Sequence, residues 1–122
     1  MTNRIAIPVS HNLGQDSPIA GHFGKAKYFA IVSDADTSFI ENTSSKFGGQ
    51  LSPPDFLMSH KIDVVISRKM GGPALQKLQS GGVQVYRMDD KRSISEIMDK
   101  YRQNGLEKMT EGHSHNHHLH NL

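Results

Sequence analysis

The side chains best suited to chemistry in this 122-residue chain are imidazoles gathered near its C-terminus. Five of the eight histidines lie in the last ten residues, at His113, His115, His117, His118 and His120. Closely spaced imidazole nitrogens on a flexible segment can bind zinc, nickel, copper or cobalt. The spacing therefore predicts a divalent-metal site, for Zn or Ni for example, whose affinity depends strongly on pH because a ligating imidazole must be neutral. The alternatives are a solvated tail without metal and an added purification tag, although the tract is interrupted by Ser, Asn and Leu whereas tags are usually unbroken.

A glycine loop after an apolar strand is the second candidate. Arg68 and Lys69 supply two cations, Gly71 and Gly72 follow, and Pro73 then suits the start of a helix. Free N–H groups at a helix start favour an anion, and glycines let the backbone approach it closely. The alternative is an ordinary strand-to-helix turn. A phosphate-binding P-loop is excluded, because no Gly-Lys-Ser/Thr follows.

Two further histidines lie beside apolar strands. His22 opens the run His22, Phe23, Gly24 and Lys25 just before the second strand, and His11 follows the end of the first strand. Either imidazole can ligate a metal or donate to an anion, and Gly24 permits a tight turn. The alternative for each is a hydrogen-bonded structural histidine.

Composition narrows the class of protein. The formal charge of +2 is too small to create a strong electrostatic field that would attract nucleic acid. No apolar run approaches the roughly 20 residues of a membrane-spanning helix. The N-terminus is too short and polar for a secretory signal, so a cytoplasmic protein is expected. The chain has no cysteine, which removes disulfides and thiolate ligands. No G-x-S-x-G or H-E-x-x-H motif is present, so we do not expect an enzyme.

The apolar pattern predicts the elements that position these residues. Strands are expected at Arg4–Val9, Tyr28–Ser33, 38–42, 62–67 and 83–87, and helices at 53–61, at 73–81 and from Ser93 to about 105. Ser52 with Asp55, and Ser93 with Glu96, have the spacing of capping boxes. Strands one to three form an antiparallel meander, and right-handed crossovers make strands four and five parallel. The fold class is α/β, and a crevice is expected at the carboxyl ends of the first and fourth strands.

These segments resemble the dinitrogenase iron–molybdenum cofactor biosynthesis family, in its small NifX-like domain. The resemblance rests on RIAIPVS, on DSPIAGHFGKAKYFAIV and on KIDVVISRKMGGPALQKLQSGGVQVY, and it spans roughly residues 4 to 105. It implies a ribonuclease-H-like motif with a five-stranded mixed sheet. We expect one cofactor-binding domain over residues 1–110, followed by a disordered His-rich tail over 111–122.

The resemblance also implies a function. It predicts a non-enzymatic protein that binds or carries an iron–sulfur or iron–molybdenum cluster during assembly or delivery, with a cofactor-assembly protein as partner and neither nucleic acid nor membrane. The expected cofactor-binding residues are His11, His22, Phe23, Gly24, Lys25, Arg68, Lys69, Gly71 and Gly72. Without thiolates, a cluster must be held by histidine or by charge and shape. The alternatives are a nickel or zinc storage protein acting through the tail and a small-anion-binding enzyme.

Overall fold

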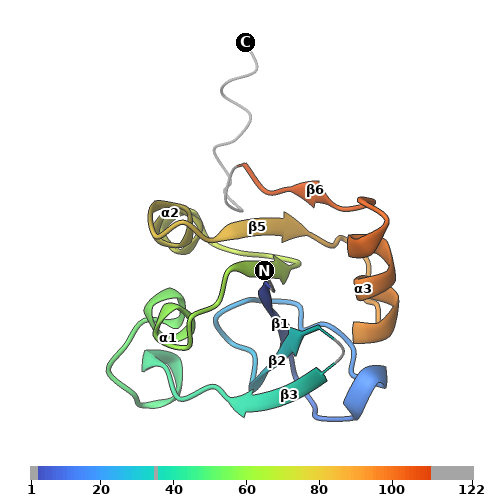
Figure 1. Ribbon diagram of the computed structural model, residues 1–122. Coiled ribbons are helices and arrows are strands. Elements are labelled where there is room, and N and C mark those ends of the chain that lie inside the picture. The colour runs from blue at the N-terminus through green and yellow to red at the C-terminus, as the bar shows by residue number, and fades with distance from the viewer. Residues whose placement is uncertain (1–2, 35, 111–122) are drawn as a thin grey trace.

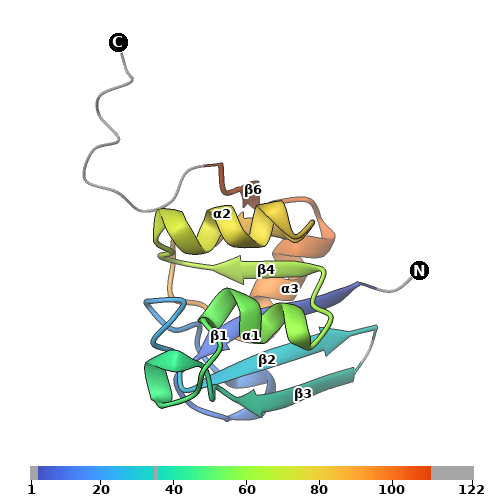
Figure 2. The same ribbon diagram turned by 90° about the vertical axis from the view of Figure 1, so that its left-hand side faces the viewer.

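A six-stranded mixed sheet with helices on both faces organises the fold (Figure 1 and Figure 2). The computed structural model describes residues 3–34 and 36–110. The strands are β1 (Arg4–Val9), β2 (Tyr28–Ser33), β3 (Asp36–Glu41), β4 (Val64–Ser67), β5 (Gln84–Arg87) and β6 (Glu107–Lys108). The helices are α1 (Pro53–Ser59), α2 (Gly72–Ser80) and α3 (Ile94–Arg102), with short 3-10 turns η1 (Gly14–Asp16) and η2 (Ser45–Phe47).

The central position of β1 confirms the predicted arrangement of strands one to five. The strand order is β3-β2-β1-β4-β5-β6. β2 pairs antiparallel with both β1 and β3, whereas β4 pairs parallel with β1 and with β5. The β-branched runs of β1 and β4 are buried because helices cover both faces of the sheet there.

The predicted number of strands is wrong, because the chain continues beyond α3 into β6. β6 pairs antiparallel with β5, with Lys108 opposite Tyr86 and Glu107 opposite Arg87. Two consecutive charged residues carry no alternating apolar signal, so the sequence pattern does not indicate a strand there. Met109 anchors the segment: its N–H donates to the Val85 carbonyl at 2.8 Å, and its side chain is buried.

The core consists of two apolar clusters, one on each face of the sheet. The first lies under α1 and α2 and centres on Phe29, whose ring centroid is 5.7 Å from that of Phe23 and 6.1 Å from that of Phe56. The second lies under α3 and includes Ile94 and Ile97, both fully buried. Each helix therefore contributes its apolar stripe to one cluster, which fixes the helix starts relative to the ends of the strands.

Side chains cap the starts of α1 and α3, but the capping box predicted for both helices is complete only at α3. Ser93 Oγ accepts from the Glu96 N–H at 3.3 Å, and Glu96 Oε1 accepts from the Ser93 N–H at 3.1 Å, which completes a capping box. At α1, Ser52 Oγ accepts from the Asp55 N–H at 3.3 Å. No helix in the described residues is long and apolar enough to cross a membrane.

An ion pair connects α1 to α2 and yields a pH prediction. Lys77 Nζ lies 2.9 Å from Asp55 Oδ2 and also donates to Ser52 Oγ at 3.3 Å. The hydrogen bond from Lys77, followed by that from Ser52, lowers the pKa of Asp55 below its ordinary value of 3.8. Lys77→Met is expected to raise the pKa of Asp55 towards that value, as measured by NMR titration of its carboxyl carbon.

The sign of the stability effect follows from that direction. Because the pKa of Asp55 is depressed in the folded chain, the stabilisation is present above the unfolded pKa and is lost as pH falls through the folded pKa. The free energy of unfolding of Lys77→Met should therefore be slightly lower than that of the parent at neutral pH, and the difference should vanish in acid. Lys77→Arg keeps the charge and serves as control. An unchanged Asp55 titration in Lys77→Met would contradict the assignment.

Candidate functional site

The site begins where β1 and β4 separate. Their registered pairs end at Ala6 and Val65. Beyond that point a segment, residues 19–23, hydrogen-bonds to both strand ends: the Ala20 N–H donates to the Pro8 carbonyl at 2.8 Å, and the Phe23 N–H donates to the Lys69 carbonyl at 3.0 Å. Proline has no N–H to donate to a neighbouring strand. It is tolerated at position 8 because β1 no longer pairs with β4 there. We call this junction the seam.

A pocket of about 370 Å³ opens beside the seam. It lies between the loop 22–25, the segment after β4, η2 and the first turns of α1 and α2. Its lining residues are His22, Phe23, Gly24, Lys25, Lys46, Pro53, Pro54, Lys69, Met70, Gly71, Pro73 and Ala74. The pocket is at the carboxyl end of β4, one of the two strand ends where the crevice was expected, and on the sheet face that α1 and α2 cover. None of the residues directly after β1 lines it.

The pocket joins buried apolar residues to exposed basic ones. Phe23 and Met70 are 3% and 2% exposed and form its apolar interior together with the prolines of the two helix starts. His22, Lys25, Lys46 and Lys69 are exposed, and no acidic residue lines the pocket among the described residues. We call these four residues the basic rim. Such an arrangement favours an anion that also has an apolar surface.

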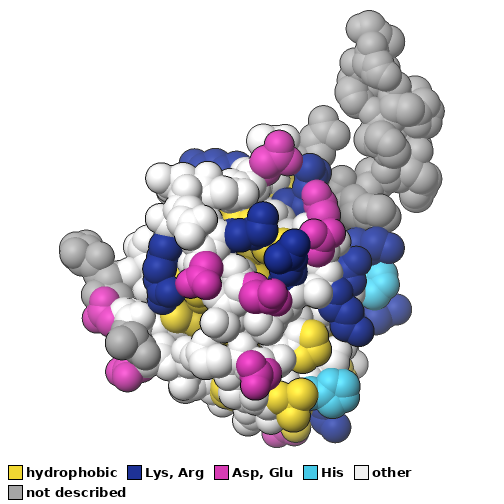
Figure 3. Space-filling view, turned by 90° about the vertical axis from the view of Figure 1, so that its right-hand side faces the viewer, with side chains coloured by type: hydrophobic (Ala, Val, Ile, Leu, Met, Phe, Trp, Pro, Cys, Tyr) yellow, Lys and Arg dark blue, Asp and Glu magenta, His cyan; other side chains and the backbone are white. Residues whose placement is uncertain are grey.

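The α3 side of the molecule has a different distribution of charge. On the face shown in Figure 3, basic and acidic side chains are intermixed across the centre. Arg87 lies 3.1 Å from Asp89 and 2.8 Å from Glu107, so its charge is locally compensated. No carboxylate lies among the described residues that line the pocket, so the charge of the basic rim is not compensated in this way.

The two helix starts at the pocket differ in what they offer a ligand. In α1 the first two residues are prolines, which have no N–H, and the Asp55 N–H is already capped by Ser52. In α2 no side chain caps the start, and the N–H groups of Gly72 and Ala74 precede the first intrahelical bond, from Leu75 to Gly71. Only the start of α2 therefore retains donors for an anion.

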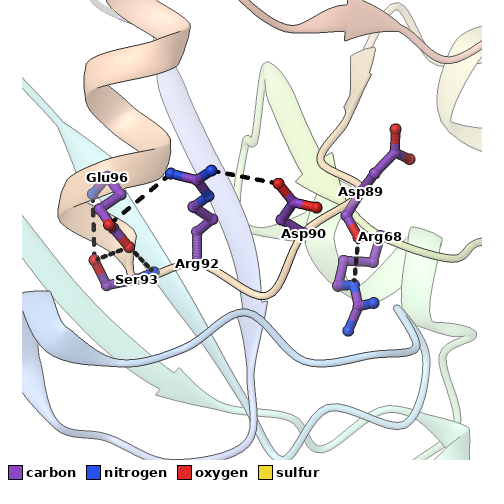
Figure 4. A network of polar contacts seen from close by, with 6 residues as sticks. All are labelled: Arg68, Asp89, Asp90, Arg92, Ser93 and Glu96. Atoms are coloured by element: carbon purple, nitrogen blue, oxygen red, sulfur yellow. Dashed lines mark hydrogen bonds and ion pairs between the residues drawn. The ribbon is translucent and has the colours of Figure 1, made fainter.

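Six of the nine predicted cofactor-binding residues line this pocket, and three do not. His22, Phe23, Gly24, Lys25, Lys69 and Gly71 are brought together. His11 is exposed and outside the lining, and Gly72 also lies outside it. Arg68 points toward the loop before α3, where its Nε donates to the Asp89 carbonyl at 3.2 Å (Figure 4). Alternate residues of an extended segment point to opposite sides, which separates Arg68 from Lys69.

Lys46 and the two prolines of α1 line the pocket but were not among the predicted site residues. Lys46 lies in η2, which precedes α1 and carries no periodic apolar pattern. Its side chain lies against Gly24: a Cβ on Gly24 would come within 3.7 Å of Lys46 Cε and 3.4 Å of Pro53 Cγ. The backbone of Gly24 is not left-handed and these distances are ordinary van der Waals contacts, so nothing in the structure requires a glycine here. The run His22, Phe23, Gly24 and Lys25 was the available sequence signal for this wall of the pocket.

A preformed metal centre is not part of this pocket. No group of three or more His, Cys, Asp or Glu side chains within metal-binding reach occurs in the described residues. His22 is the one histidine in the lining, and the chain has no cysteine. The predicted ligands His113, His115, His117, His118 and His120 lie outside the described residues.

A family comparison decides the class of protein. The family model described as dinitrogenase iron-molybdenum cofactor matches residues 3–104. The chain belongs to this family. The predicted resemblance is thereby confirmed, and the dinitrogenase iron–molybdenum cofactor match spans β1 to β5 and the three α-helices. It ends before β6. No curated protein sequence matches the chain.

Solved structures share the fold over nearly the whole chain. The apo form of the orange protein from Desulfovibrio gigas is 19% identical with a TM-score of 0.81, covering 92% of this chain and 97% of that one. A candidate NifB protein from Thermotoga is 24% identical with a TM-score of 0.77, covering 93% and 98%. A candidate dinitrogenase from Methanocaldococcus jannaschii is 19% identical with a TM-score of 0.69, covering 91% and 98%. At these identities the likeness concerns the fold alone.

Proposed function

We propose that the chain binds and carries an iron–molybdenum or iron–sulfur cluster during cofactor assembly, and that the pocket beside the seam holds it. One observation carries the proposal: a cavity of about 370 Å³ has a buried apolar interior, a basic rim of four residues and no acidic lining residue among those described. The family match supports a cargo of this chemical class.

The chemistry of the pocket fits an anionic cluster. Sulfide-rich faces of a cluster are soft and weakly hydrated, so they suit Phe23 and the thioether of Met70. Negative charge on the cluster, or on an organic acid attached to it, suits Lys69 and the open N–H group of Ala74 at the start of α2. His22 supplies the pocket's imidazole, which can ligate an exposed metal.

The same donor set favours a carrier over a resident cofactor site or an enzyme. With one imidazole, one thioether and no thiolate, the pocket holds its cargo mainly by charge and shape, so release to an assembly partner is easy. The lining offers no carboxylate to act as general acid or base beside His22. We place the protein in the cytoplasm as part of this proposal. The boundary at residue 110 and the ribonuclease-H-like classification stay predictions.

A second candidate function rests on the sequence of the tail. Five imidazoles between positions 113 and 120 favour a mononuclear metal site, for zinc or nickel, that acts beside the pocket or in its place. The two candidates differ in where the metal is bound, so a chain ending at Gly112 separates them.

Cluster uptake by the full chain and by the chain ending at Gly112 tests the proposed function. Isolated iron–molybdenum cofactor is offered to each anaerobically, and metal content and visible absorption are recorded after gel filtration. We expect both chains to retain the cluster to a similar extent, because every pocket-lining residue precedes position 75. In a parallel titration with Zn²⁺ or Ni²⁺, the full chain should bind the metal ion and the chain ending at Gly112 should not.

The outcomes separate the two functions. Loss of cluster uptake together with the tail would refute the pocket as the binding site and would make the tail the metal site. Failure of both chains to take up cluster would refute the carrier function. Circular dichroism of the shortened chain shows whether the fold is intact, which the comparison requires.

A further inference from the structure

A buried amide lies behind the pocket and connects two of its walls. Asn42 follows β3 and is 2% exposed. Its Nδ2 donates to the Ala26 carbonyl at 2.8 Å and to the Gly24 carbonyl at 3.3 Å. Its Oδ1 accepts from the Ser44 N–H at 3.0 Å. One side chain thus holds backbone groups of two separate turns.

Each of these turns carries one cation of the basic rim. Lys25 lies between Gly24 and Ala26, whose carbonyls both accept from the Asn42 amide. Lys46 comes two residues after Ser44, whose N–H donates a hydrogen bond to Oδ1 of the same amide. The backbone N–H of Asn42 itself donates to the Lys27 carbonyl at 2.9 Å, which adds a further bond between the two turns.

The amide is suited to this position by its bonding capacity and not by its polarity. Both of its N–H donors and its oxygen are engaged, so burying it leaves no donor unsatisfied. An apolar residue of similar size would leave two carbonyls and one N–H without these partners. A buried hydrogen-bond network in which every group is paired adds little net stability. Its main effect is to hold the groups that it joins in one arrangement.

We propose that Asn42 is the positioning residue of the pocket: it sets the separation of Lys25 and Lys46 and thereby selects the size of the anion bound between them. The part of this inference that concerns the ligand rests on the proposed function. The part that concerns the two cations does not, so the two can be tested separately.

The first measurement reports the separation directly. Because the chain has no cysteine, Lys25→Cys and Lys46→Cys can be labelled together with nitroxides without removing any native thiol. Dipolar broadening in the EPR spectrum of the frozen, full-length chain gives the distribution of distances between the labels. We expect one narrow distribution of label-to-label distances when Asn42 is present, and a broader or displaced distribution when Asn42→Leu is added.

Ser44→Ala is the matched control. Ser44 is buried in the same turn, and its hydroxyl has no hydrogen-bond partner among the described residues, so its removal leaves the bonds of Asn42 in place. The label separation should be unchanged in Ser44→Ala. Asn42→Ser, which loses the amide but keeps a small polar side chain, makes the same comparison if Asn42→Leu does not fold.

The second measurement is the affinity of the unlabelled, full-length chain for isolated iron–molybdenum cofactor. We expect an Asn42 variant that remains folded to bind about tenfold more weakly, and Ser44→Ala to bind as the parent does. A folded Asn42 variant with an unchanged label distribution would overturn the proposal. A broadened distribution with undiminished affinity would overturn the part of the proposal that concerns the ligand.

These readouts separate a positioning role from a structural one and from the carrier function. A loss of stability alone lowers the melting temperature without altering the label separation in the folded protein. If the parent chain does not bind the cofactor, the carrier function fails, while the label distribution still decides whether Asn42 sets the separation of the two turns.

Discussion

Replacing Lys25, Lys46 and Lys69 together by glutamine is expected to weaken binding of the iron–molybdenum cofactor by about 10- to 100-fold. All three side chains are exposed at the pocket rim. An exposed charge contributes about 0.5–1 kcal/mol to an ion pair, so three contribute about 1.5–3 kcal/mol. An anaerobic titration followed by visible absorption measures the change. The loss should shrink as salt is added, because salt already screens exposed charges in the parent chain.

A matched triple variant controls for net charge. Lys91, Lys100 and Lys108 do not line the pocket, and replacing them by glutamine changes the formal charge by the same amount. This control should bind within about twofold of the parent, since charges beyond a Debye length are largely screened at physiological salt. Equal losses in the two triple variants would mean that the cofactor responds to overall charge and not to this pocket.

Phe29→Ala is expected to lower the free energy of unfolding by about 3–5 kcal/mol. The Phe29 side chain is fully buried between the rings of Phe23 and Phe56, so its removal leaves a cavity under both the pocket and α1. A domain of this size typically has about 5–15 kcal/mol of stability in total, so the variant should be close to unfolding at 37 °C. Urea denaturation followed by circular dichroism measures the change in midpoint.

Phe47→Ala is the appropriate comparison for this substitution. Phe47 is the same residue type but is 47% exposed in η2, and its loss should change the free energy of unfolding by only about 0.5 kcal/mol. A cost below about 1 kcal/mol for Phe29→Ala would contradict the packing described here. Phe23 lines the pocket and packs against Phe29. Phe29→Ala should therefore also bind the cofactor more weakly under conditions in which it remains folded.

Strands and caps were predictable from the sequence where local signals agree. β1 and β2 have the bounds expected from their β-branched runs, and the capping box of Ser93 and Glu96 forms as its spacing indicates. β6 was not predictable in this way. Glu107 and Lys108 form a strand because Met109 is buried against Val85 and β5 offers an open edge, which are tertiary conditions that a local pattern does not contain.

The pocket was predictable in position but only in part in composition. The order of strands placed it at the carboxyl end of β4, and six predicted residues line it. Arg68 was included because it neighbours Lys69, yet alternation along an extended segment directs it elsewhere. Lys46 was missed because its place in the pocket depends on the bonds of Asn42 to a loop about 16 residues earlier in the chain.

The seam has a mechanical consequence for the pocket. β1 and β4 share two registered pairs, whereas β1 and β2 share six and β4 and β5 share four. The junction between β1 and β4 is therefore held by fewer registered pairs than the junctions on either side of it. Lys46 and Pro53 follow the antiparallel half, while Lys69 and Ala74 follow β4 in the parallel half. A cargo that touches both walls would therefore bridge the junction with the fewest registered pairs of these three and would add contacts across it.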